Sequence, residues 1–302
     1  MRLVFAGTPA VAVPALRSLA ERFEIAAVIT REDAPLGRKR VLTPSPVAAA
    51  AAELGLTVIK ANRLREEVTE RVAALRPDLG VIVAYGGLVR EPLLSTPRLG
   101  WVNLHFSLLP RWRGAAPVQH ALIAGDHETG AAVFQLVPEL DAGAVFAETR
   151  RAVGPDETAG ELLESLAVSG SALLTETVAA LDAGTAVAHE QTGRPTLAPK
   201  LTIDDARLDL SHPVDRVYAR FRGVTPEPGA WVLLGADRFK IHAARPSAAD
   251  PLPAGTVAAD GKRILAGTGS RPLELLTVQP AGRKPMSAAD WWRGAGGEAV
   301  LS

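Results

Sequence analysis

Two polar side chains stand near the end of a short apolar run, residues 101–105, that reads as a strand. Asn103 and His105 are two residues apart, so both side chains leave the same face of a strand. A loop punctuated by Pro110 and Gly114 follows at once, and such loops let a backbone close around a small ligand. An amide can polarise a carbonyl group and an imidazole can move protons. The pair therefore predicts acyl-transfer chemistry.

The elements that must position this pair alternate along the first part of the chain. Near-continuous apolar runs, typical of parallel strands that are buried on both faces, occur at 2–6, 25–29, 58–59, 79–83 and 102–105. Helix-like segments occur at 47–54, 65–75 and 118–124. This alternation predicts an α/β protein with a mostly parallel sheet. Because ligands bind at the carboxyl ends of such strands, His105 and Tyr85-Gly86 fall at the expected binding edge.

The pattern continues and then changes. We expect strands at 129–137 and 145–153, with Asp141 in the turn between them, and a helix over 158–181 that Thr158 caps. Residues 183–200 are small, polar and rich in glycine and proline, which reads as a linker. After a helical stretch at 214–222, short apolar runs follow at 230–234, 239–242, 255–258, 263–266 and 273–278. Their spacing predicts a small antiparallel barrel or sandwich.

Composition limits the class of protein. A length of 302 residues, with 47% hydrophobic and 22% charged residues, fits a globular protein of one large or two ordinary domains. No run approaches about 18 apolar residues and no leader precedes the first strand, so we expect neither a membrane span nor a secretory signal. The lack of cysteine excludes thiol chemistry and fits the cytoplasm. A net charge of zero weakly disfavours a nucleic-acid partner but permits a local basic patch.

The motif around the polar pair resembles a known family. Asn-x-His-x-Ser-Leu-Leu-Pro at 103–110, followed by Leu-Asp-Ala-Gly at 140–143, is similar to the formyltetrahydrofolate-dependent formyltransferases. The run Arg-Trp-Arg-Gly-Ala-Ala-Pro at 111–117 narrows the resemblance to the branch that acts on methionyl-tRNA. Further matching segments lie at 5–9, 37–38, 44–47, 83–86, 197–200 and 279–282. The resemblance therefore covers nearly the whole chain.

The resemblance implies a fold and an activity. The implied fold is a Rossmann-like formyltransferase domain at 1–183, a linker at 184–206 and an OB-like β-barrel domain that binds tRNA at 207–302. The implied reaction moves the formyl group of 10-formyltetrahydrofolate, without a metal, to the amino group of initiator methionyl-tRNA. The protein would be a cytoplasmic monomer that serves translation initiation.

The resemblance also implies site residues. Asn103, His105 and Asp141 would be catalytic: the amide and a protonated imidazole donate to the formyl oxygen, and the carboxylate favours the charged imidazole. Taken alone, His105 could satisfy a backbone carbonyl and Asp141 could simply form a turn. The folate donor would be bound by Val83, Ala84, Tyr85, Gly86, Ser107, Leu108, Leu109 and Pro110.

Basic residues in three places are candidates for tRNA contact. Arg38, Lys39 and Arg40 form a triplet in a loop, where a solvated surface cluster is the simpler interpretation, and Glu32 and Asp33 dilute its charge. Arg111 and Arg113 flank a tryptophan just beyond the motif and could bind phosphate bidentately or be ordinary surface residues. Lys200 could contact RNA or be a linker lysine.

Alternative functions remain to be distinguished. Gly7-Thr8-Pro9 follows the first strand, where a dinucleotide fold has its fingerprint, but the full Gly-x-Gly-x-x-Gly pattern is missing and Pro9 removes an amide donor. We therefore expect a tight turn there and disfavour a nicotinamide dehydrogenase. Another formyl-folate enzyme, acting on a nucleotide, a sugar amine or water, is the close alternative. A catalytically idle RNA- or folate-binding protein is disfavoured by the intact Asn103, His105 and Asp141.

Overall fold

The chain folds into two compact units. The computed structural model describes residues 1–37 and 39–302. The first unit comprises Met1–Pro117, Glu128–Arg151 and Leu163–Ala198, and the second comprises Val118–His127, Ala152–Leu162 and Pro199–Ser302. The chain therefore passes between the units several times before it enters the C-terminal part of the second unit.

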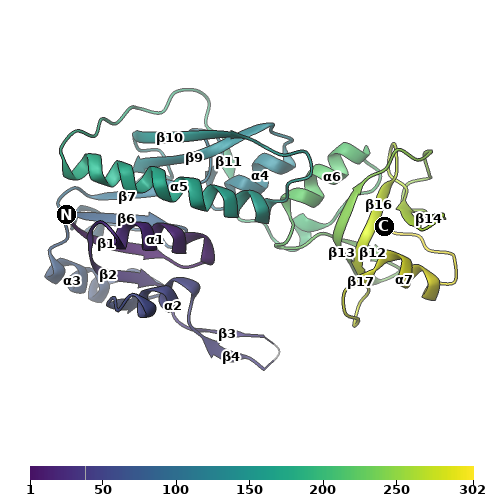
Figure 1. Cartoon of the computed structure of the whole chain (residues 1–302), viewed down its shortest axis with the longest axis horizontal. Helices are drawn as coiled ribbons and strands as arrows, with labels where there is room; N and C mark the ends of the chain where they lie inside the picture. Colours follow the sequence, from purple (N-terminus) through teal and green to yellow (C-terminus); the bar gives the residue numbers. More distant parts are fainter. Residues whose placement is uncertain (38) are drawn as a thin grey trace. The chain divides into compact units, whose positions relative to one another are not determined.

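A seven-stranded sheet forms the centre of the first unit, in the order β10-β9-β7-β6-β1-β2-β5 (Figure 1). The strands are β1 (Arg2–Gly7), β2 (Glu24–Thr30), β5 (Val58–Lys60), β6 (Leu79–Val83), β7 (Trp101–His105), β9 (Glu128–Gln135) and β10 (Val145–Ala152). Strands β5, β2, β1, β6 and β7 are parallel, and β9 runs antiparallel to β7. The prediction of a Rossmann-like, mostly parallel sheet is confirmed.

Apolar residues on both faces explain why the central strands lie inside. All five residues of β6 are buried, as are the last five of β1. One face, which includes Val4, Ile29 and Ile82, packs against Val68 and Val72 of helix α3 (Glu66–Leu75). Burial of each such aliphatic side chain stabilises the fold by roughly 1.5–3 kcal/mol.

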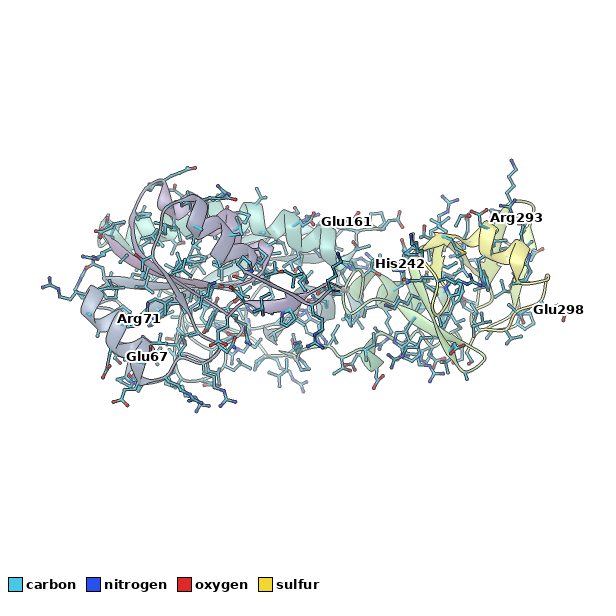
Figure 2. The ribbon with its side chains drawn as sticks, turned by 90° about the horizontal axis from the view of Figure 1, so that it is seen from below. Glu67, Arg71, Glu161, His242, Arg293 and Glu298 are labelled. Atoms are coloured by element: carbon cyan, nitrogen blue, oxygen red, sulfur yellow. The ribbon has the colours of Figure 1, made fainter. Side chains whose placement is uncertain are left out.

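Helices cover both faces of the sheet. Figure 2 shows α3, which carries Glu67 and Arg71, on one face. The other face is covered by α1 (Val13–Ala20), which follows the short turn η1 (Ala10–Ala12), by α2 (Pro46–Glu53) and by α5 (Ala159–Asp182). A hydrogen bond of 2.8 Å between Ser18 and Thr175 joins α1 to α5. The first unit also contains the short turn η2 (Leu93–Ser95), whereas α4 (Pro117–Ile123) lies almost wholly in the second unit.

The long helix α5 begins as its sequence predicts. Thr158 precedes it, and the Glu161 carboxylate accepts hydrogen bonds from the Thr158 backbone N–H and hydroxyl, a capping arrangement that satisfies helix-end donors. By length and composition alone α5 could cross a bilayer, but half of its most apolar 18-residue window is buried within the protein. That burial fits the core helix of a globular unit.

Two small sheets of the first unit are absent from the sequence-based prediction. Strands β3 (Ala34–Leu36) and β4 (Val41–Thr43) form an exposed hairpin. Strands β8 (Arg113–Gly114) and β11 (Leu197–Ala198) pair in parallel. A further isolated bridge joins Val145 to His189. The glycine- and proline-rich segment after α5 therefore belongs to the first unit as far as Ala198, although most of its residues are exposed.

The second unit contains an antiparallel sheet in the order β12-β13-β16-β15-β14, with β17 beside β16. Its elements are η3 (Asp204–Ala206), α6 (Val214–Gly223), β12 (Trp231–Leu234), β13 (Asp237–Pro246), β14 (Val257–Asp260), β15 (Arg263–Ala266), β16 (Leu273–Gln279), β17 (Met286–Ser287) and α7 (Ala288–Gly294). Helix α7 packs Trp291 against Phe239 of β13, with ring centroids 4.5 Å apart. This curled antiparallel sheet agrees with the predicted C-terminal domain.

The last residues of the chain join the two edges of this sheet. Leu233 of β12 exchanges two backbone hydrogen bonds with Ser302, of 2.6 and 2.9 Å. On the other edge, the N–H of Val257 in β14 donates to Ala299, and the N–H of Leu301 donates to Gly255. Because Leu301 is only 2% exposed, the C-terminal segment closes the sheet and also fills its core.

Candidate active site

His105 stands at the carboxyl end of β7 and is 5% exposed. Its Nε2 lies 2.9 Å from the carbonyl oxygen of Trp112, and its Nδ1 lies 3.7 Å from Oδ2 of Asp141. The Phe134 ring meets the imidazole edge to face, with centroids 6.3 Å apart. Since a carbonyl only accepts, the Trp112 contact assigns a proton to Nε2.

Asp141 lies in the turn between β9 and β10 and is 9% exposed. Its Oδ2 accepts a 2.7 Å hydrogen bond from the backbone N–H of Gly114. The distance of 3.7 Å to His105 is too long for a hydrogen bond, so this contact is electrostatic. Asp141 has a positive φ of 45° and Trp112 one of 60°, a conformation that ordinary residues hold only where their surroundings impose it.

The charge state of His105 depends on two opposing effects. Burial lowers its pKa, while the Asp141 carboxylate and the hydrogen bond to Trp112 raise it, and the net direction is downward. Desolvation dominates because the imidazolium is taken out of water on nearly all sides. A lowered pKa favours the neutral imidazole, and the protonated imidazole that the sequence analysis expects stays a prediction.

Asn103 lies on the same face of β7 as His105, one side-chain position earlier, and is half-buried. Asn103 is paired with Ile82 of β6 on one side and with Phe134 of β9 on the other. It therefore has a neighbouring strand on both sides. Its amide makes no hydrogen bond within the part of the chain that the structure describes. The amide N–H groups can therefore bind an acceptor atom on a ligand.

The two segments expected to bind folate follow neighbouring strands. The segment 83–86 continues β6, with Ala84 at φ 49° and Gly86 at φ 75°, both exposed. Tyr85 is buried and its hydroxyl donates to the Ala61 carbonyl at 2.7 Å. The tyrosine ring is therefore part of the core, and this segment can offer a ligand only backbone groups and its two exposed residues.

The second folate segment follows β7. Ser107 is fully buried and its hydroxyl donates to the carbonyl of Arg111 at 2.6 Å. Leu109 packs against Ala132 and Phe134. Leu108 is half-buried, which makes it the member of 107–110 whose side chain can both pack and contact a ligand. Ser107 closes the loop that brings Trp112 back to His105.

The candidate tRNA residues are found in different settings. Arg38 lies outside the described residues. Lys39 and Arg40 are exposed at the tip of the β3–β4 hairpin. Arg111 is exposed, with its guanidinium 5.4 Å from the Trp112 ring centroid. Lys200 is exposed on the second unit.

Arg113 differs from these exposed residues. Its guanidinium donates to the Oε1 of Gln191 through Nε at 3.1 Å and Nη2 at 2.7 Å. It also pairs with Glu139 at 3.6 Å, and its side chain is only 13% exposed. These contacts direct Arg113 toward the Asp141 turn, and tRNA contact by Arg113 stays a prediction.

Three residues that touch the site were missed from the sequence. Arg31 donates to the Gly86 carbonyl at 2.6 Å and lies 3.5 Å from that of Tyr85. Thr196 accepts from the backbone N–H of Trp112 at 2.9 Å. Gln191 contacts both Arg113 and the Asp141 turn. The sequence carries no signal for them, because each acts on a backbone group far away along the chain.

Within residues 1–37 and 39–302, no three histidine, cysteine, aspartate or glutamate side chains are placed to hold a metal ion.

Family models match both parts of the chain. Residues 1–178 match the formyl transferase family and residues 200–296 match the formyl transferase C-terminal domain. The chain therefore belongs to the formyl transferase family, as the motif at 103–110 predicted.

Relatives from other organisms are similar over the full length. Methionyl-tRNA formyltransferase of Leifsonia xyli is 79% identical over 302 residues, covering all of both chains. The methionyl-tRNA formyltransferase of Clavibacter sepedonicus is 60% identical, again with full coverage of both. Among solved structures, an N-formyltransferase of Helicobacter canadensis in complex with folinic acid and dTDP-3-aminofucose superimposes with a TM-score of 0.70. It covers 92% of this chain and 98% of its own at 14% identity, which shows a shared fold.

Proposed function

We propose that this protein transfers the formyl group of 10-formyltetrahydrofolate to the free amino group of initiator methionyl-tRNA, in the cytoplasm. The observation that carries this proposal is the 79% identity, over the full length of both chains, to a methionyl-tRNA formyltransferase. The geometry is compatible with it, because Asn103 and His105 lie on the same face of β7 and Asp141 lies 3.7 Å from His105. The amide and the imidazole supply the two functions that acyl transfer needs.

Asn103 stabilises the transition state. The amino nitrogen of methionine attacks the formyl carbon, and negative charge develops on the formyl oxygen. A donor that is already in place costs no reorganisation as this charge develops. The half-buried Asn103 amide, with N–H groups that bind no other protein atom described, is suited to donate there.

His105, with the support of Asp141, transfers protons between the attacking nitrogen and N10 of the folate. The neutral imidazole donates from Nε2 to Trp112 and has an unprotonated Nδ1. It accepts the proton that the attacking nitrogen loses, directly or through a water, and returns a proton to N10 of the folate as the bond from N10 to the formyl carbon breaks. Asp141, 3.7 Å away, stabilises the imidazolium during this step.

The two substrates are assigned to different groups of residues. We assign folate binding to 83–86 and 107–110 in a catalytic domain at 1–183, which precedes a linker at 184–206. We assign tRNA binding to the domain at 207–302, to Lys200, Arg111 and Arg113, and to the basic triplet Arg38, Lys39 and Arg40, of which Lys39 and Arg40 lie at the β3–β4 tip. The exposed lysine and arginine side chains at the β3–β4 tip support this assignment, because phosphate contacts from such residues dominate nucleic-acid affinity.

One incubation tests the proposal. The full chain is mixed with 10-formyltetrahydrofolate and charged initiator tRNA, and formylmethionine is detected after release from the tRNA. Parallel reactions offer an amino-sugar nucleotide or water as the acceptor, and the Asn103→Ala variant is the matched control. Formylmethionine with the parent and little with the variant supports the proposal. Formylation of the sugar amine alone, or folate hydrolysis alone, would overturn it.

A further inference from the structure

The segment between α5 and β11 contacts the site from outside the family motifs. Gln191 lies in it, half-buried, and its side-chain amide makes four hydrogen bonds. Nε2 donates to the backbone oxygens of Asp141 at 2.7 Å and Gly143 at 2.9 Å. Oε1 accepts from Nε of Arg113 at 3.1 Å and from its Nη2 at 2.7 Å. Both donors and both lone pairs of the amide are thus used.

The two segments that Gln191 joins are the ones that place the Asp141 carboxylate. Arg113 directly precedes Gly114, whose N–H donates to the Asp141 carboxylate at 2.7 Å. On the other side, Gln191 binds the carbonyl of Asp141 itself. A change at Gln191 would therefore release the carboxylate from both directions at once.

The Asp141 turn needs such support. Asp141 has φ 45°, which a residue other than glycine keeps only where its surroundings hold it. At Gly143, an added Cβ would lie 1.8 Å from the Gln135 carbonyl oxygen, so this part of the turn is already pressed against β9. Gln191 binds the carbonyl of Asp141, two residues before this close approach, and the carbonyl of Gly143 itself.

We propose that Gln191 is a positioning residue, which holds the Asp141 carboxylate at its distance from His105 during formyl transfer. Its kinetic consequence rests on the proposed function, whereas its effect on the Asp141 turn does not. Three charged groups lie around these hydrogen bonds. Asp141 faces His105, and Arg113, which pairs with Glu139, donates to Gln191.

A titration tests the positioning directly. Gln191→Met keeps the length of the side chain and removes its four hydrogen bonds. In the full-length protein, the imidazole of His105 is followed by NMR as the pH is varied, and it is assigned among the six histidines with a His105→Ala variant. We expect the pKa of His105 to fall in Gln191→Met, because the raising effect of Asp141 weakens as the carboxylate moves.

Gln135 offers a matched control. It is also half-buried, and its Nε2 donates to the Trp101 carbonyl at 3.0 Å. Trp101 begins β7, roughly 13 Å along the strand from His105 at about 3.3 Å per residue. Gln135→Met therefore removes hydrogen bonds to the Leu99 and Trp101 carbonyls, at the other end of β7, and we expect it to leave the His105 titration unchanged.

A double-mutant cycle separates positioning from general stabilisation. We expect Gln191→Met to lower kcat roughly 10-fold, because a displaced Asp141 carboxylate stabilises the imidazolium less. Coupling between contacting residues is of this order. The KM for the folate should be nearly unchanged. In an Asp141→Asn background the same change should lower kcat no further. Additive losses, or an unchanged His105 titration in folded Gln191→Met, would overturn the proposal.

A second variant, Gln191→Glu, is used if Gln191→Met does not fold. Gln191→Glu keeps oxygens that accept from Arg113 but offers no N–H to the carbonyls of Asp141 and Gly143, and it replaces Gln191→Met in the cycle. If the parent transfers no formyl group to methionyl-tRNA, the proposed function fails. The titration of His105 in variant and control then still decides whether Gln191 positions Asp141.

Discussion

Substitution of Asp141 by asparagine tests the electrostatic part of the mechanism. The change keeps the size of the side chain and its ability to accept from the Gly114 N–H. It also suits the positive φ of 45° at this position, since asparagine tolerates that conformation well. The fold should therefore survive, and only the negative charge opposite His105 is lost.

The size of the effect follows from the geometry. Two unit charges at the observed separation of 3.7 Å attract by about 4 kcal/mol at an effective dielectric constant of about 20. If the imidazolium forms only in the transition state, the whole attraction would be lost from it, which corresponds to roughly 10³ in rate. Because water or the asparagine dipole replaces part of it, we expect kcat to fall about 10²–10³-fold with little change in folate affinity.

The pH profile gives the sign of the effect. The pKa of His105 is lowered by burial, and Asp141 opposes that shift. Without the carboxylate the pKa falls further. If activity needs the neutral imidazole, it is lost as pH falls through this pKa; if activity needs the charged form, it is lost as pH rises through it. In either case the inflection that belongs to His105 moves to lower pH in Asp141→Asn.

The assay measures single-turnover formyl transfer across pH, together with the NMR titration of His105. Asp78→Asn is the matched control, because Asp78 also accepts from a backbone N–H, that of Arg2 at 2.8 Å. Asp78 precedes β6, so it lies at the opposite end of the parallel strands from His105. A variant of Asp141 with unchanged turnover would remove Asp141 from the mechanism. An unchanged His105 titration would show that its role is not electrostatic.

Three further predictions concern other parts of the chain. Asn103→Ala should lower kcat about 10²–10³-fold without unfolding, as loss of an oxyanion donor does; near-parental single-turnover rates would contradict its role. Neutralising Arg38, Lys39 and Arg40 together should weaken tRNA binding and flatten its salt dependence while folate affinity persists, and an unaltered slope in binding titrations would leave them as surface charges. Removing residues 299–302 deletes four backbone hydrogen bonds, at about 1 kcal/mol each, and the burial of Leu301, about 2 kcal/mol. Calorimetry should then show the second unit melting well before the first, and a single unshifted transition would refute this.

The strands of the first unit could be predicted because their burial is written into consecutive residues. Strands such as β1 and β6 are apolar on both faces, and their runs are too short for a buried helix. The short pairs β3–β4 and β8–β11 could not be found in the same way. Strand β8 has two residues, and its partner Leu197 is far along the chain from Arg113, so no periodicity exists to detect.

In the candidate site, too, local features could be predicted from the sequence and nonlocal ones could not. The residue types of Asn103, His105 and Asp141 indicate their chemistry, and short sequence motifs contain them. The pKa of His105 depends instead on how deeply β7 is buried between its neighbours, which a sequence pattern does not state. Burial lowers this pKa, while Asp141 raises it.

The segment after α5 shows how a nonlocal contact can determine a local motif. Both ring nitrogens of His105 face groups that this segment holds in place. The Trp112 carbonyl faces Nε2, and the Trp112 N–H is bound by Thr196. The Asp141 carboxylate faces Nδ1, and its turn is bound by Gln191. The composition of this segment is typical of a linker because it has no apolar pattern of its own, yet its side chains satisfy backbone groups that the motif leaves open. A change in this segment should therefore alter catalysis while the motif itself remains intact.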